Sequence, residues 1–311
     1  MKSLAPIGLS TYSRLKHLKQ TIVALQNNTL AKDSELYIFS DAAKSGDEKV
    51  VAEVRKYIHT IDGFKNVQII ERETNGRVAN NRGGMKQLLD EYGKIIFMEE
   101  DIVTAPGFLE FMNRALEFYE NDDSILSISG FGLPILIENY PSDIYALSRF
   151  NAWGLGIWQK KFKLVDYITE KEYAEFLNDK DAVTSFAQGG GEDMLRMLKL
   201  EMSGGIDTFD VKAMFCQFKN KMLTVYPKNS LVQNIGHDGS GIHCGETDRF
   251  HHDKLWNKLN GFKFLAAPQV DEKIRKANYI FRKQSAKERA RIYLKKVGIY
   301  SLLRRLKSRL R

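Results

Sequence analysis

Hydrophobic residues over the first 130 positions follow two spacings in turn. Short apolar runs with the length and composition of buried strands occur at 5–9, 35–40, 67–70, 94–98 and 124–129. Between these runs, apolar residues recur three and four positions apart, as in amphipathic helices, over 15–25, 50–61, 79–92 and 108–119. Strands that alternate with helices predict an α/β domain with a largely parallel sheet.

Beyond residue 130 the periodicity weakens. Aromatic and glycine clusters follow, with the triple glycine Gly189–Gly191 and a stretch rich in Gly and His at 236–245. We expect these two segments to be functional loops on one scaffold.

Composition limits the class of protein. With 311 residues, 43% hydrophobic and 28% charged, the chain is long enough to fold around a substantial core. Its two cysteines are too few for a disulfide framework, and the first residues lack the features of a signal peptide. No apolar run approaches the roughly 18 residues that span a membrane. We expect a cytoplasmic protein.

The net charge of +8 is unevenly distributed. Residues 282–311 hold twelve Lys or Arg and one acid, a net of +11, which leaves −3 for residues 1–281. A uniformly basic nucleic-acid-binding domain is therefore not indicated. Leucines and Ile299 at helical spacing make 282–311 a basic amphipathic C-terminal helix, suited to the anionic inner face of the cell membrane. A solvated or dimer-forming helix is the alternative.

Three acids follow the apolar run at 94–98, namely Glu99, Glu100 and Asp101. Ligands bind open α/β sheets at the carboxyl ends of the strands. Adjacent carboxylates repel one another there unless a cation neutralises them, and oxygen ligands favour Mg²⁺ or Mn²⁺. The alternative is that these acids cap the next turn and face water.

The stretch NGRVANNRGGMKQLLDEYGKIIFMEEDIVTAPGFLEFMNRAL, residues 75–116, resembles nucleotide-sugar glycosyltransferases of the Rossmann-like GT-A fold. In that family a DXD-like acidic triplet closes the strand that binds the metal and the sugar diphosphate. The similarity is greatest to bacterial enzymes of surface-polysaccharide pathways and more distant to the alpha-1,3-mannosyl-glycoprotein N-acetylglucosaminyltransferases. It implies a GT-A domain over 1–281, in which helices flank a mixed, mostly parallel sheet. The nucleotide-binding half would be 1–130 and the acceptor and catalytic half 131–281.

The resemblance implies roles for individual residues. Asp101 would bind the metal, Glu100 would contact the ribose or metal-bound water, and Glu99 would be the more structural member of the triplet. This chain has EED where many relatives have EDD or DXD. The nucleoside and phosphates would contact residues of the first strands and the 75–82 segment: Pro6, Tyr12, Arg14, Asp41, Asn75, Gly76 and Arg82. The alternative for Asn75 and Gly76 is turn formation. The alternative for Arg14 and Arg82 is a solvated helix face.

A general base is expected at Asp193, with Glu192 as the alternative. Both follow the triple glycine in GGGEDMLRM and begin a predicted helix, whose dipole stabilises anions. Related enzymes carry their base on an acidic pair in a comparable position. A capping role is the alternative.

Two further segments resemble parts of the family site. FNAWGLGIWQKKF matches the aromatic loop beside the donor sugar and acceptor, with Trp153 the pocket candidate and Trp158 expected in the core. In SLVQNIGHDGSGIHCG a histidine would complete the metal shell; His243 matches better than His237.

The sequence therefore predicts a metal-dependent, inverting hexosyl- or N-acetylhexosaminyltransferase. The donor would be a nucleotide sugar, with UDP the commonest nucleotide in such families, and the acceptor a glycan or a lipid-linked glycan. The rivals are a sugar-nucleotide nucleotidyltransferase, whose glycine-rich first loop is absent from PIGLSTYSRLKHL, and a catalytically silent sugar-binding or scaffold protein on the membrane.

Overall fold

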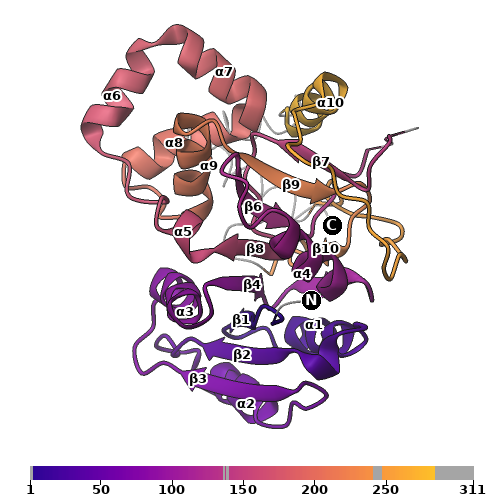
Figure 1. Cartoon of the computed structure of the whole chain (residues 1–311). Helices are drawn as coiled ribbons and strands as arrows, with labels where there is room; N and C mark the ends of the chain where they lie inside the picture. The colour runs from indigo at the N-terminus through magenta and orange to yellow at the C-terminus, as the bar shows by residue number, and fades with distance from the viewer. Residues whose placement is uncertain (1–2, 136, 138–139, 241–246, 284–311) are drawn as a thin grey trace, which may run out of the picture.

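The computed structural model describes residues 3–135, 137, 140–240 and 247–283. Its centre is a sheet of eight strands in the order β3-β2-β1-β4-β8-β6-β9-β7 (Figure 1). In chain order the strands are β1 (Ile7–Thr11), β2 (Glu35–Ser40), β3 (Asn66–Glu71), β4 (Lys94–Glu99), β6 (Ile125–Ser129), β7 (Ile144–Leu147), β8 (Leu155–Trp158) and β9 (Leu223–Pro227). A separate ribbon pairs β5 (Ile102–Thr104) with β10 (Val232–Asn234).

Most of the sheet is parallel. Strands β3, β2, β1 and β4 run in one direction, and β6 pairs in parallel with β9. Strand β8 lies antiparallel between β4 and β6, and β7 is antiparallel to β9 at the edge. The predicted α/β class with a mixed, mostly parallel sheet is confirmed.

Helices cover both faces of the sheet because neighbouring strand residues point to opposite sides. Leu36 and Ile38 pack in one core with α1 (Leu15–Gln26), α2 (Glu48–Ile58) and α4 (Phe108–Phe118). Tyr37 and Phe39 belong to the opposite core, which is covered by α3 (Arg77–Tyr92), α5 (Gln159–Phe162), α6 (Glu170–Asn178), α7 (Lys180–Gly190), α8 (Glu192–Met202) and α9 (Phe209–Lys219).

The elements expected in the first 130 residues are all present, with bounds shifted by up to three residues. One 3-10 turn, Ala31–Asp33, lies between α1 and β2. As expected, Trp158 is a core residue: it is buried and its indole Nε1 donates to the carbonyl of Leu116.

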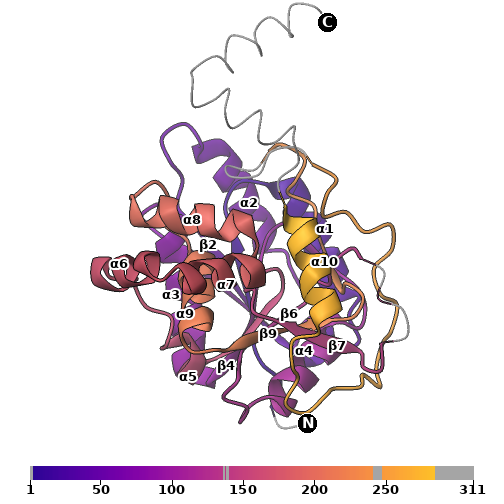
Figure 2. The same cartoon turned by 90° about the horizontal axis from the view of Figure 1, so that it is seen from above.

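The second half is more regular than its sequence suggests. Gly189 and Gly190 end helix α7 and are not loop residues, which corrects the expectation for the triple glycine. Only Gly191, with a φ of +105°, joins α7 to α8. The last helix among the described residues, α10 (Glu272–Arg282), packs on α7 and α8 (Figure 2).

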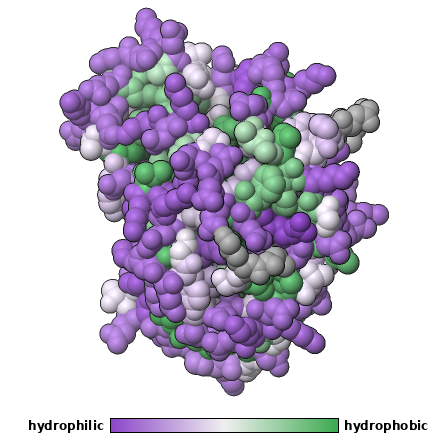
Figure 3. Space-filling model, viewed as in Figure 1, coloured by the Kyte–Doolittle hydropathy of each residue, from purple (hydrophilic) through white to green (hydrophobic). Residues whose placement is uncertain are grey.

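The expected tail lies outside the described residues from 284 onward, so its helical character stays a prediction. Among the described residues, no helix combines the length and apolarity needed to cross a bilayer. On the face seen in Figure 3, hydrophobic residues form separate patches among hydrophilic ones.

Candidate active site

The acidic triplet stands at the carboxyl end of β4, as predicted. Glu100 and Asp101 are buried. The Oε2 atom of Glu100 accepts hydrogen bonds from the Thr11 hydroxyl at 2.7 Å and the Tyr12 amide at 2.5 Å. This carboxylate therefore ties β4 to the loop after β1.

Arg14 joins the two buried acids. Its Nε atom donates to Glu100 at 2.7 Å and its Nη2 atom donates to Asp101 Oδ2 at 2.8 Å. Desolvation alone would lower the pKa of Arg14, but Asp101 and Glu100 outweigh it and raise that pKa. Arg14 therefore neutralises part of the negative charge of these acids, which the sequence analysis expects a metal ion to neutralise.

Glu99 differs from its two neighbours because it touches solvent. The protein atoms around it, and then the charges of Asp101 and Asp210, raise the pKa of its carboxyl to about 7. Asn81 donates to it at 2.9 Å. Burial also raises the pKa of Asp210, on α9, to about 6, against the opposing effect of Arg149 and Arg77. Both carboxyls therefore hold a proton more readily than ordinary acids do.

The residues beside Asp101 suit a divalent cation. Asp101 Oδ1 and both ring nitrogens of His237 are buried without hydrogen-bond partners. The amide of Ile235 donates to the Asp101 carbonyl at 2.9 Å, and a Cβ built on Gly236 would lie 2.0 Å from Asp101 Oδ2. A carboxylate oxygen and an imidazole nitrogen are ligands of Mn²⁺, and diphosphate or water would supply the others.

In the part of the chain that the structure describes, no cluster of three metal-binding side chains occurs. His243 lies outside the described residues, so its role stays a prediction. Desolvation lowers the pKa of His237, despite the nearby charge of Asp101, and this keeps the ring in its neutral, ligating form.

Aromatic rings hold His237 in place. Its ring stacks on Phe250 with centroids 5.0 Å apart and meets the edge of Trp153 at 5.4 Å. Trp153 also contacts Phe131 at 4.8 Å. The structure thus brings the predicted pocket tryptophan to the histidine beside Asp101.

The expected nucleoside-binding residues gather around the ends of β1 and β2. Asp41 is buried, and its carboxylate accepts from the Asn75 side chain at 3.2 Å and from the Gly76 amide at 3.0 Å. Tyr12 donates its hydroxyl to Asp47 at 2.6 Å. Pro6 is not part of this group: it is buried at the opposite, amino end of β1, where its carbonyl accepts from the Ile96 amide.

Arg82 has other partners. Its Nη2 atom donates to the Val165 carbonyl at 3.1 Å, and its guanidinium lies over Tyr167, 5.3 Å from the ring centroid. These contacts link α3 to the segment between α5 and α6. Among the described residues, no hydrogen bond or ion pair joins Arg82 to another candidate.

The candidate base lies at the α7–α8 junction. Both oxygens of Asp193 accept from Arg149, at 2.9 and 2.8 Å. Burial would raise the pKa of Asp193, but Arg149 and then Arg282 outweigh this and lower it. Asp193 is therefore ionised at neutral pH, as a proton acceptor must be.

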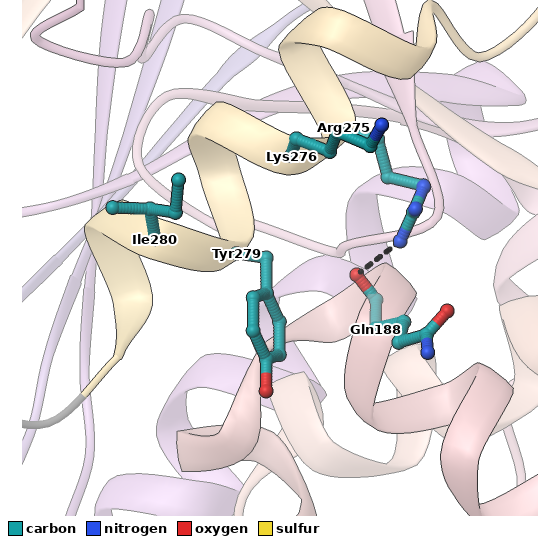
Figure 4. Close-up of a pocket in the computed structure, with 5 residues that line it drawn as sticks. All are labelled: Gln188, Arg275, Lys276, Tyr279 and Ile280. Carbon is teal, nitrogen blue, oxygen red and sulfur yellow. Dashed lines mark hydrogen bonds between the residues drawn. The ribbon is translucent and has the colours of Figure 1, made fainter.

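Glu192 faces a different environment. It accepts from the Tyr279 hydroxyl at 2.9 Å, and Tyr279 also lines an open pocket of about 300 Å³ between α7 and α10 (Figure 4). The pocket wall adds Gln188, Arg275, Lys276 and Ile280. The two acids thus begin the same helix with different partners.

The sequence analysis overlooked three residues of this region: Arg149, Asp210 and Arg282. Nothing in their local sequence separates them from surface charges.

Some solved structures share parts of this fold at low similarity. S. aureus TarS matches with 11% identity over 74% of this chain and 36% of its own, at a TM-score of 0.39. GalNAc-T7 with UDP, GalNAc and Mn²⁺ matches with 10% identity over 73% of this chain and 43% of its own, at a TM-score of 0.44. Mannosyltransferase PcManGT from Pyrobaculum calidifontis in complex with GDP-Man and Mn²⁺ matches with 10% identity over 70% of each chain, at a TM-score of 0.35. This chain thus spans about a third of TarS.

Sequence relationship is more informative. No curated protein matches the chain. The family model described as Glycosyl transferase family 2 matches residues 7–177, which is more than half of the chain. The matched region contains the acidic triplet, and the expected GT-A resemblance is confirmed. The chain belongs to glycosyl transferase family 2.

Proposed function

We propose that this protein is a metal-dependent, inverting glycosyltransferase that moves a sugar from a nucleotide donor to a hydroxyl of a glycan or lipid-linked acceptor. A role in bacterial surface-polysaccharide synthesis fits the sequence resemblance. The observation that carries the proposal is the unpartnered, buried Oδ1 atom of Asp101 beside the unpartnered ring of His237.

The donor would occupy the carboxyl end of β1, β2 and β4. Asp41, Asn75, Gly76 and Tyr12 form the nucleoside end, and Asp101 with His237 would hold Mn²⁺ or Mg²⁺. The bound ion would neutralise charge on the leaving diphosphate. Glu100 and Arg14 fix the loop that carries Tyr12.

Asp193 would take the proton of the acceptor hydroxyl while that oxygen attacks the anomeric carbon. The bond between this carbon and the diphosphate oxygen breaks on the opposite face, so the configuration inverts. The pairing with Arg149 orients both carboxylate oxygens of Asp193. Glu192 is the alternative base.

Calorimetric titration tests the donor site. UDP, GDP, dTDP and CMP are titrated into the full chain with and without Mn²⁺, and again into Asp101→Asn. We expect one nucleoside diphosphate to bind with a dependence on metal that the substitution abolishes. The matched control is Asp62→Asn, an acid outside the site.

Each other outcome favours a rival. Binding of no nucleotide supports the sugar-binding or scaffold protein. Turnover of a sugar phosphate with a nucleoside triphosphate supports the nucleotidyltransferase. Tight binding without metal, unchanged in Asp101→Asn, contradicts the metal site.

We also propose that the basic C-terminal tail attaches the protein to the inner face of the cell membrane. The support is the net charge of +11 over residues 282–311 against −3 for the remainder; without the buried Arg282 the tail still carries +10. Each Lys or Arg near anionic lipid contributes about 1 kcal/mol. A membrane-bound enzyme would meet lipid-linked acceptors at higher local concentration.

A further inference from the structure

A second feature of the site is a buried cation for which the described residues supply no ion pair. Arg282, the last residue of α10, is only 5% exposed. Its Nε and Nη2 atoms have no hydrogen-bond partner, and no ion pair within 4.0 Å involves it among the described residues. A buried charge of this kind is costly unless an opposite charge reaches it.

The surroundings of Arg282 concentrate positive charge. Its guanidinium lies over the rings of Phe250 and Phe281, with centroids at 5.2 and 5.3 Å. Burial, and then the like charge of Arg149, lower the pKa of Arg282 to about 9, so it remains a cation at neutral pH. Asp193 is the nearby anion and raises the pKa of Arg282, but its hydrogen bonds among the described side chains are with Arg149 and not with Arg282.

Arg282 lies on the side of the candidate base. A Cβ built on Gly191 would be 2.9 Å from the Arg282 Cβ, 2.5 Å from Asp193 Oδ1 and 3.1 Å from Arg149 Nη1. The three side chains therefore converge on one backbone position. The proposed metal ligands lie across Phe250, which stacks on His237.

We infer that Arg282 binds an oxyanion of the acceptor, a phosphate or carboxylate group close to the hydroxyl that Asp193 deprotonates. The inference rests on the proposed function and specifies its acceptor class. A guanidinium matches such groups geometrically, with two parallel hydrogen bonds. Phe250, which covers the guanidinium, lies on the connection between β10 and α10, outside helix and strand, and the inference requires its ring to move aside when the ligand binds.

Inorganic phosphate is the probe, titrated calorimetrically into the full chain in two states. One state has no nucleotide; the other is saturated with Mg²⁺ and the nucleoside diphosphate that binds best. We expect phosphate to bind in both states, because the donor diphosphate occupies a different site. Binding that disappears in the saturated protein overturns the inference and assigns Arg282 to the donor diphosphate.

Arg282→Gln should weaken phosphate binding at least tenfold and change nucleotide binding less than twofold. The matched control is Lys276→Gln, which removes a positive charge from the same helix, where the side chain is 68% exposed. Equal losses of phosphate and nucleotide binding in Arg282→Gln contradict the inference. If the wild type binds no nucleotide, the proposed function is refuted instead, so the two failures are distinguishable.

Stability gives an independent measurement. Arg282→Met keeps the bulk of the side chain and removes the unpaired charge, so its unfolding temperature in phosphate-free buffer should exceed that of the wild type. Added phosphate should raise the unfolding temperature of the wild type and not that of Arg282→Met. A variant less stable than the wild type would show that the charge is already compensated within the protein, against the inference.

Discussion

Asp193 and Arg149 form a pair in which each residue depends on the other. Asp193→Asn removes the proton acceptor, so turnover should fall by about 100-fold or more while the donor still binds. It also leaves Arg149 buried without its carboxylate, at a cost of up to about 3–5 kcal/mol. Turnover of this destabilised variant should therefore be measured at low temperature, after circular dichroism confirms that it is folded. Full turnover in this variant, with loss in Glu192→Gln, would transfer the role of base to Glu192.

Asp210 makes stability depend on pH. Burial raises the pKa of its carboxyl to about 6 in the folded state, above the ordinary value near 3.8. Ionisation therefore costs folding free energy, a penalty that is absent below pH 3.8 and complete above pH 6. Asp210→Asn should stabilise the protein at pH 7 by up to about 3 kcal/mol relative to its effect at pH 4. Urea unfolding at both pH values measures this; an equal difference at both would contradict it.

The conspicuous site residues could be predicted from sequence, whereas the groups that surround them could not. The acids at 99–101 follow a run of apolar residues, and Asp193 follows three glycines, so local pattern marks both. Arg149 and Arg282 take their importance from burial against segments that lie about 30 to 90 residues away in the sequence. The residues next to Arg149 and Arg282 in the sequence do not predict contacts with segments so far away.

At the scale of helices and strands, Gly107 fixes the start of α4. A Cβ at this position would lie 2.0 Å from the carbonyl oxygen of Lys258, and a backbone atom cannot yield easily. Gly107→Ala should therefore lower the unfolding free energy by about 3 kcal/mol. Gly93→Ala is the comparison: φ is +74° but no atom lies within 4 Å, so strain alone should cost about 1 kcal/mol. Chemical denaturation of both variants tests this, and equal losses would contradict the steric explanation.

The first-half elements follow from their sequence, and several second-half elements do not. β2 and β4 are uninterrupted apolar runs bounded by polar turns. β7 and β8 have only four residues each, too few for a periodic signal. In α7 the tertiary contacts of Gly189 and Gly190 outweigh their poor helix propensity.

For the whole molecule, the uneven charge predicts a separable membrane contact. A chain truncated after Lys283 loses ten basic residues and one acid, a net of +9. We expect it to lose binding to vesicles that contain phosphatidylglycerol and to keep its nucleotide affinity, as measured by co-sedimentation and calorimetry. The full chain with neutral phosphatidylcholine vesicles is the control. Undiminished vesicle binding by the truncated chain would place the contact on the folded body.

The reversed strand β8 has a consequence for how the protein folds. Because β8 runs antiparallel to β4, with Leu155 beside Phe97, the loop that carries Trp153 reaches the acidic end of the sheet. The site therefore requires pairing between segments about sixty residues apart, and contacts at such separation form slowly. Regain of nucleotide binding should then lag behind regain of helical signal during refolding. A bound nucleotide would slow unfolding more than it speeds folding. The folded protein would then unfold more slowly when its nucleotide ligand is present.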